Sequence, residues 1–243
     1  DVEFGEDPVN NKDQTGNYIV KGTENGKLVI TPVTDKVTVT ITGRTLETTY
    51  DGKVHDVFGY DATPSNALYR PNEDIQFNGT DYDKIAKGTD AGKYDMKLTV
   101  EHFTNINDNF TNVEFIVTDG YVKINPRSVK LTSASDEKVY DGKPLMNETV
   151  AVGGDGFADG EGATYDFTGS QTDVGESENA FTFEVNEGTK KENYTFEVAI
   201  GTLKVNPVTD KVTVTVTEKS DTVTYDGMPH TVSGYASMTA DNP

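Results

Sequence analysis

Chemically reactive side chains are few in this sequence, which has three histidines and no cysteine. His55 and His230 each follow a Tyr-Asp-Gly turn by the same spacing, and Leu145 takes that place after a third such turn. A position that accepts leucine is a packing position, so we interpret both histidines as structural. His102 has no second histidine or carboxylate at ligand spacing, and no serine lies in a nucleophile elbow. We therefore predict no catalytic residue, no cofactor and a protein that is not an enzyme.

The acidic loops are the next place where chemistry could occur, because calcium prefers carboxylate and carbonyl oxygens. The best candidates are Asp155, Asp159 and Glu161, in the loop GDGFADGE. Their spacing does not fit an EF-hand, and carboxylate-rich loops are expected in so acidic a chain. We predict solvated turns and no metal site, with these three residues as the weak calcium alternative.

A lysine–asparagine isopeptide bond is a cross-link that some Gram-positive surface domains use where others use disulfides. It needs a lysine near the first strand and an asparagine on the last strand of a domain. Lys36 with Asn125, and Lys130 with Asn206, have this order. Neither pair has an obvious buried acid beside it, so the sequence leaves the cross-link open.

Aromatic side chains could form a sugar-binding platform, since the chain has 12 Tyr and 11 Phe. Most of them recur at equivalent places in the repeats described below, which indicates core packing. Tyr69 and Tyr82 are less regular, and we predict that they are the residues available for ligand contacts. Both fall in residues 66–87, a segment that is shorter in the second repeat. Loops that differ on a common scaffold are where binding residues usually lie.

Internal repeats organise the whole chain. TPVTDKVTVTITGRTLETTYDG, from Thr31, returns as NPVTDKVTVTVTEKSDTVTYDG, from Asn206, after 175 residues. A more distant copy lies between them. We predict four segments: residues 1–32, the end of a B-type module; 33–126, module A; 127–207, module B; and 208–243, the start of another A-type module.

Alternating apolar and threonine residues open each A-type segment and predict a strand with one buried face. Val37, Val39 and Ile41 should point into the core, with Thr38, Thr40 and Thr42 opposite. In module B, Phe181, Phe183 and Val185 should point inward. Each module should close with a hairpin, at Asp119-Gly120 in A and at Gly201 in B. Short helical turns are expected near 71–74, 100–103 and 156–160.

Two sequence signals mark the modules, a turn signal and a strand-end signal. Asp-Gly favours tight turns because glycine accepts positive φ, and a proline after the last strand ends that strand cleanly. Few residues separate each proline from the next strand, so we predict stiff junctions and neighbouring repeats as the first partners of each module. The structural residues are Tyr50, Asp51, Gly52, Tyr140, Asp141, Gly142, Tyr225, Asp226, Gly227, Pro32, Pro126 and Pro207.

Composition excludes several classes of protein. Lys plus Arg is 21 and Asp plus Glu is 41, so the formal charge is 21 − 41 = −20. Without a basic cluster, nucleic acid and anionic membranes are not expected as partners. No apolar run is long enough for a membrane span. The 34 Thr and 27 Val are β-branched and favour strands.

The repeats resemble the YDG/MBG-type modules of large bacterial surface proteins, found as tandem arrays in Gram-positive gut commensals. The residues that carry the resemblance are the three YDG turns, the GSQTDVG segment from Gly169 and the endings in Gly-x-Leu-x-Val-x-Pro. The resemblance implies an extracellular stalk or adhesin segment, anchored to the cell wall through regions outside this chain. As the alternative, it implies a binding module for a host surface glycoprotein, mucin or an immunoglobulin.

We therefore predict an all-β protein of tandem small antiparallel modules in an elongated array. An Ig-like β-sandwich is favoured because no good helix is visible, and a β-grasp arrangement is the alternative. The terminal segments should also be ordered. We expect a hairpin over residues 17–32, and we expect Val212–Val216 to pair with strands outside its own segment, because an isolated hairpin is marginal in water.

Overall fold

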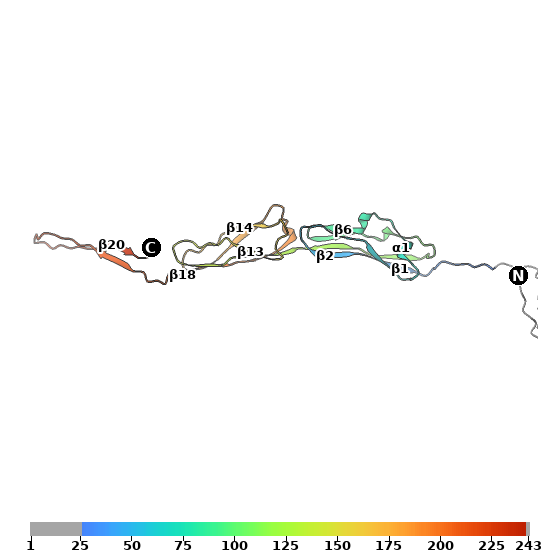
Figure 1. Cartoon of the computed structure of the whole chain (residues 1–243), viewed down its shortest axis with the longest axis horizontal. Coiled ribbons are helices and arrows are strands. Elements are labelled where there is room, and N and C mark those ends of the chain that lie inside the picture. The colour runs from blue at the N-terminus through green and yellow to red at the C-terminus, as the bar shows by residue number, and fades with distance from the viewer. Residues whose placement is uncertain (1–25, 242–243) are drawn as a thin grey trace, which may run out of the picture. The chain divides into compact units, whose positions relative to one another are not determined.

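The computed structural model of the chain describes residues 26–241 (Figure 1). These residues form two compact units. Unit 1 holds the described residues up to Arg44, with Gly59–Lys84 and Lys97–Gly120; unit 2 holds Thr45–Phe58, Ile85–Met96 and the residues from Tyr121 onward. Unit 2 continues through Pro126 and Pro207, and the module boundaries at these prolines stay a prediction.

Unit 1 is built on a three-stranded sheet in the order β4-β1-β9. Its strands are β1 (Val37–Gly43), β4 (Tyr60–Pro64) and β9 (Val113–Thr118). Val37, Val39 and Ile41 are almost completely buried, whereas the threonines between them are half-buried or exposed. The predicted register of this strand is confirmed: its apolar face lies in the core because alternate side chains point to opposite faces of a strand.

A second layer in unit 1 is the pair β5 (Ile75–Phe77) and β8 (Phe103–Asn105). Phe103 joins the layers, because its ring lies 4.9 Å from Tyr60 of β4 and 5.9 Å from Phe115 of β9. Short helical turns connect these strands: α1 (Pro71–Asp74), η2 (Asp81–Lys84) and η3 (Val100–His102). The turns expected near 71–74 and 100–103 are thus confirmed, whereas residues 156–160 contain no helical turn.

The first part of unit 2 pairs β2 (Thr45–Thr49), β10 (Tyr121–Asn125) and β7 (Gly92–Asp95) in one sheet. A two-stranded sheet is made by β3 (His55–Phe58) and β6 (Ile85–Gly88). Val122 and Ile124 of β10 are buried, as is Ala86 of β6. These residues contribute to the apolar interior of this part of unit 2.

Residues 127–207 of unit 2 can be followed in Figure 1 from β13 through β14 to β18. The strands are β11 (Arg127–Ser133), β12 (Asp136–Val139), β13 (Val150–Gly154), β14 (Ala163–Phe167), β15 (Gly175–Glu178), β16 (Phe181–Val185), β17 (Tyr194–Ala199) and β18 (Thr202–Asn206), with the turn η4 (Lys191–Asn193). They form the sheets β13-β11-β17 and β12-β18-β15 and the pair β14-β16. Phe181 is buried and Phe183 and Val185 are half-buried, and all three face opposite to the exposed residues between them, as predicted.

The sheets are mixed and not purely antiparallel, which corrects the predicted strand arrangement. β1 pairs with β9 in parallel and with β4 antiparallel, and β11 repeats this with β17 and β13. β10 with β2, and β18 with β12, are also parallel pairs. A parallel pair needs a long connection, which these modules supply through the strands and turns between their first and last strands.

The closing hairpins predicted at Asp119-Gly120 and at Gly201 are wrong. β9 and β10 lie in different sheets, as do β17 and β18, so neither pair forms a ladder. Gly120 does not adopt a positive φ, and the Asp119 carboxylate accepts bonds from the backbone N–H groups of Lys97 and Leu98, both at 2.9 Å. The Asp-Gly pair therefore serves as a point where the chain changes sheet.

The terminal segments also differ from expectation. The predicted hairpin over 17–32 lies largely outside the described residues, and residues 26–32 contain no strand. β19 (Val214–Glu218) pairs with β20 (Tyr235–Ala240), inside its own segment, so the predicted pairing outside 208–243 is wrong. Local antiparallel pairing satisfies the backbone, as β1 and β4 do in unit 1, but Val214 and Val216 remain about half exposed.

The described part of the chain is all-β, as predicted. Facing layers joined by aromatic side chains make the packing β-sandwich-like. A β-grasp arrangement needs a helix against the sheet, and the longest helices in residues 26–241 have four residues. No helix in this range could cross a membrane.

Candidate functional site

The three Tyr-Asp-Gly turns have the conformation that their sequence predicts. Gly52, Gly142 and Gly227 have φ of 78°, 75° and 78°. The aspartate of each turn accepts a hydrogen bond from the backbone N–H two residues on, as Asp51 does from Lys53 at 2.9 Å. Asparagine- and aspartate-type turns of this kind fix the local backbone, so each turn holds its tyrosine in a defined direction.

The three tyrosines differ greatly in burial. Tyr50 is 4% exposed, Tyr140 is 42% exposed and Tyr225 is 93% exposed. Because the turns are alike, the difference comes from what packs against each ring. The Tyr50 ring meets Tyr194 edge to face, with centroids 5.6 Å apart. Tyr194 begins β17, so a side chain from residues 127–207 buries a tyrosine from the preceding segment.

Glu161 joins these two tyrosines through hydrogen bonds. Its Oε1 accepts a hydrogen bond from the Tyr50 hydroxyl, and its Oε2 accepts one from the Tyr194 hydroxyl at 2.8 Å. The Tyr194 hydroxyl in turn accepts a bond from the backbone N–H of Ala158 at 3.0 Å. Hydrogen bonds to an ionised carboxylate are stronger than neutral ones, so Glu161 is a substantial tie between the two segments.

Burial also changes the ionisation of both phenols. Desolvation, together with the neighbouring Glu161 carboxylate, raises the pKa of Tyr50 to about 12. Desolvation likewise raises the pKa of Tyr194 to about 12, with Glu161 as a further cause. Both tyrosines are therefore neutral hydrogen-bond donors across the physiological pH range.

Arg127, which follows Pro126 directly, binds three backbone carbonyl oxygens. Its Nε donates to Gly156 at 2.8 Å and its Nη2 to Asp155 at 2.6 Å. Its Nη1 donates to the carbonyl of Tyr50 at 3.3 Å. The planar guanidinium thereby connects the Tyr50 turn to the loop that carries Glu161.

The Thr-Asp-x-Gly turn of module A supplies a second contact with residues 127–207. Lys190 lies 2.6 Å from Oδ2 of Asp90, and the Asn193 amide donates to Oδ1 of Asp90 at 2.9 Å. The backbone N–H of Ala91 donates to Oδ1 of Asn193 at 2.7 Å. The hydrogen bond from Lys190 is the main cause that lowers the pKa of Asp90, and the bond from Asn193 lowers it further.

We call these residues the junction cluster. Its tail side consists of Tyr50, Asp90 and Ala91, and its head side consists of Arg127, Glu161, Lys190, Asn193 and Tyr194. Asn193 is completely buried, and each of its amide atoms has a partner in the tail side. The polar atoms of this cluster are used in holding two segments together.

The structure corrects one of the two predicted ligand contacts. Tyr69 is 2% exposed, and its hydroxyl donates to the Asp74 carbonyl at 3.1 Å and to Asn105 at 3.0 Å. It is a core residue, because its ring also packs on Phe110 at 5.2 Å. Tyr82 is 85% exposed on η2 and stays available as a predicted contact.

The weak calcium candidates do not gather around one point. Glu161 belongs to the junction cluster, and the Asp155 carboxylate accepts a bond from the backbone N–H of Ser128 at 3.1 Å. Asp159 shares no hydrogen bond with either of them among the described residues. In residues 26–241, no group of three or more acidic, histidine or cysteine side chains could hold a metal ion.

Other predicted residues have structural partners. His55 lies 2.8 Å from Asp51 and His230 lies 2.8 Å from Asp226, while Leu145 is buried with Leu203 and Val205. The isopeptide pair Lys130 and Asn206 is not brought together. Lys130 binds Glu197 at 2.5 Å, and Asn206 donates to Glu137 at 3.4 Å in a different sheet.

Unit 1 contains a hollow that is lined in part by residues of the segment 66–87, which is shorter in module B. Arg44, Tyr60, Asp61, Asn72 and Phe77 line it, together with Ala62, Pro71 and Ile75. Arg44 and Asp61 form an ion pair at 3.1 Å, and the Tyr60 and Phe77 rings lie 5.9 Å apart. An aromatic pair beside a charged pair and an amide can contact the apolar face and the hydroxyls of a sugar.

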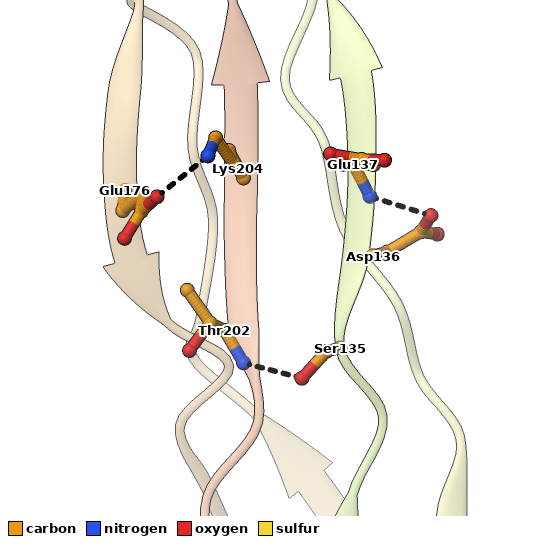
Figure 2. Close-up of a pocket in the computed structure, with 6 residues that line it drawn as sticks. All are labelled: Ser135, Asp136, Glu137, Glu176, Thr202 and Lys204. Carbon is orange, nitrogen blue, oxygen red and sulfur yellow. Dashed lines mark hydrogen bonds and ion pairs between the residues drawn. The ribbon is translucent and has the colours of Figure 1, made fainter.

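A shallower hollow lies on the outer face of the β12-β18-β15 sheet (Figure 2). Lys204 on the central strand β18 forms an ion pair with Glu176 of β15 at 3.1 Å. Glu137 of β12 lies opposite Lys204 on the other side of β18. Ser135 accepts a bond from the Thr202 backbone at 3.0 Å. These lining residues are exposed, and such a cross-strand charge ladder is typical of a solvated sheet face.

The sequence signals for the junction cluster are incomplete. The repeats mark Tyr50 and the Thr-Asp-x-Gly turn as equivalent positions, which indicates packing or turn roles. Glu161 stands out only as an acid in a loop, and no motif points to Arg127 or Lys190. The one available signal is that Arg127 and Lys190 differ from their module A counterparts, Val33 and Ile106.

Comparison with known families identifies part of the chain. Residues 36–126 match the family model of the MBG domain, a range inside the predicted module A. The resemblance drawn from the YDG turns is thus confirmed for this part of the chain, and the match indicates a β-rich module of a surface protein. Searches of curated proteins and of solved structures return no significant match.

Proposed function

From the premise that residues 36–126 are an MBG domain, we propose that this chain is a non-enzymatic stalk segment of a bacterial surface adhesin. Its role is to extend and present a binding region away from the cell. The observation that carries the proposal is the junction cluster. In a stalk, each module must hold a fixed orientation relative to the next one, which requires side chains that bind the two modules to each other.

The junction cluster has the properties that such a joint needs. Arg127 removes freedom at the residue after Pro126 by binding carbonyls on both sides of the junction. Glu161 and Asp90 each accept bonds from the opposite segment at separate points. Two separate points of attachment oppose bending and twisting of the junction together.

The proposal places the segment outside the cell, with anchoring to the cell wall through other regions of a longer protein. Its expected partners are neighbouring repeats, and nucleic acid and membrane insertion are not expected, in keeping with a formal charge of −20. The absence of cysteine suits this role, because polar clusters and apolar cores then replace disulfides as the source of rigidity.

Small-angle scattering of the 243-residue chain tests the stalk proposal. We expect an elongated particle with a well-defined maximum dimension that does not change between low and high salt. A compact particle, with module A folded against module B, would refute it.

A binding module for a host glycoprotein, mucin glycan or immunoglobulin is the second candidate, and the hollow in unit 1 favours it. Here the test is a glycan array and a host-protein pull-down with the full chain, with Arg44→Ala as the disabling variant. Arg70→Ala is the matched control, because Arg70 is also exposed and paired with an acid, Glu73, at 2.6 Å. Binding lost in the first variant and kept in the second would favour a binder.

A further inference from the structure

The tail side of the junction cluster uses two motifs that recur in module B. Tyr140 corresponds to Tyr50, and Asp173 of the turn Thr172–Gly175 corresponds to Asp90. Modules A and B therefore each carry a tyrosine and an aspartate at the end that meets the next module. What varies is the head that receives them.

The head side differs between the two module types. Pro32, Pro126 and Pro207 align the starts of the modules, so Arg127 of B corresponds to Val33 and Val208 of the A-type segments. The structure supports this alignment, because Arg127 pairs in parallel with Tyr194 as Val33 does with Phe110.

The same alignment carries through the rest of the head. Asn193-Tyr194 corresponds to Asn109-Phe110, and Lys190 corresponds to Ile106. Each replacement removes one interaction of the cluster. Valine cannot donate to the tyrosine carbonyl, isoleucine cannot pair with the aspartate, and phenylalanine has no hydroxyl for a carboxylate.

We infer that the head of module B is a specific receptor surface for the tail of an A-type module, and that the head of an A-type module is not one for the tail of B. This inference rests on the proposed stalk function. In an array with a 175-residue period, A-to-B joints are then fixed and B-to-A joints pivot. The repeating mechanical unit is the A–B doublet, and bending is confined to every second joint.

Spin-label distance measurements on the full chain test this inference, and the lack of native cysteine makes labelling simple. Cysteines at Asp56 and Asp166, both exposed, report on the A-to-B joint. We expect a narrow distance distribution for this pair.

The decisive variant converts the B head into an A head with Arg127→Val, Lys190→Ile and Tyr194→Phe. It should broaden the distance distribution between positions 56 and 166. Tyr140→Phe is the matched control and should leave that distribution unchanged. If the triple variant loses its strand signal in circular dichroism, the single change Tyr50→Phe, which leaves the B head intact, takes its place and should broaden the distribution in part.

The outcomes separate this inference from the stalk function. A narrow A-to-B distribution that neither variant broadens would refute the receptor role of the head and leave the stalk proposal standing. A broad A-to-B distribution in the unchanged chain would overturn the joint and the stalk together.

Discussion

Replacing Tyr50 by phenylalanine tests the physical account of the junction cluster directly. The change keeps the ring that packs edge to face on Tyr194 and removes only the hydroxyl that donates to Glu161. Glu161 keeps its bond from Tyr194 but loses one of its two phenol donors. The perturbation is therefore confined to one charge-assisted hydrogen bond.

The expected magnitude follows from that bond. A hydrogen bond to a charged group contributes about 1.5–3 kcal/mol, and a buried acceptor left without its donor adds to the loss. We expect Tyr50→Phe to lower the free energy of unfolding by about 1.5–3 kcal/mol. Tyr140→Phe, at the half-exposed equivalent in module B, should stay within about 0.5 kcal/mol of the unchanged chain.

Urea unfolding of the full chain, followed by far-ultraviolet circular dichroism, measures both variants under one condition. A double-mutant cycle with Tyr194→Phe sharpens the result, because both hydroxyls bind the same carboxylate and their effects should not add. Equal effects of Tyr50→Phe and Tyr140→Phe would refute the reasoning. So would strict additivity in the cycle.

Further predictions concern charge, packing and metal. Asp90 has a lowered pKa in the folded state, so its contribution to stability is present above the ordinary aspartate pKa and is lost as pH falls through the folded value. Asp90→Asn should lower the thermal midpoint at neutral pH and should reduce the fall of that midpoint between neutral and acid pH. Tyr50 and Tyr194 have pKa values raised to about 12 from 10.0, so their stabilisation is complete below pH 10.0 and is lost as pH rises from there to about 12. Burial raises the pKa of Tyr69 to about 12 as well, so ultraviolet titration should show a late-ionising group of tyrosines that becomes normal on unfolding, and Tyr50→Phe should remove one member of it. Gly201→Ala should destabilise the chain by about 1–3 kcal/mol, because a methyl group there overlaps the carbonyl oxygens of Ser133 and Ala134 at the end of β11. Alanine at the open Gly188 position, despite its positive φ, should cost less in the same urea assay. EDTA should leave the thermal midpoint unchanged, and a drop of several degrees would instead indicate a structural cation.

The sequence alone determined the features that depend on local backbone chemistry. The alternation in 37–42 fixed which face of β1 is buried, because side-chain direction has a period of two in any strand. The three Asp-Gly turns took positive φ at glycine as expected, because the turn is made by adjacent residues. The repeats also located equivalent tyrosines and turns, because like stretches of sequence form like local structure.

Tertiary structure decided everything that depends on partners distant in the chain. Asp119-Gly120 has the sequence of a hairpin, yet parallel pairing of the flanking strands with β1 and β2 prevailed, and no local signal encodes a partner more than 70 residues away. Tyr50 and Tyr140 have the same motif, and only the residues that pack against them made one a buried donor and left the other half-exposed. Glu161 was one acid among 41 until the fold placed two phenol hydroxyls on its carboxylate, because a hydrogen bond between residues 111 positions apart exists only once the chain is folded.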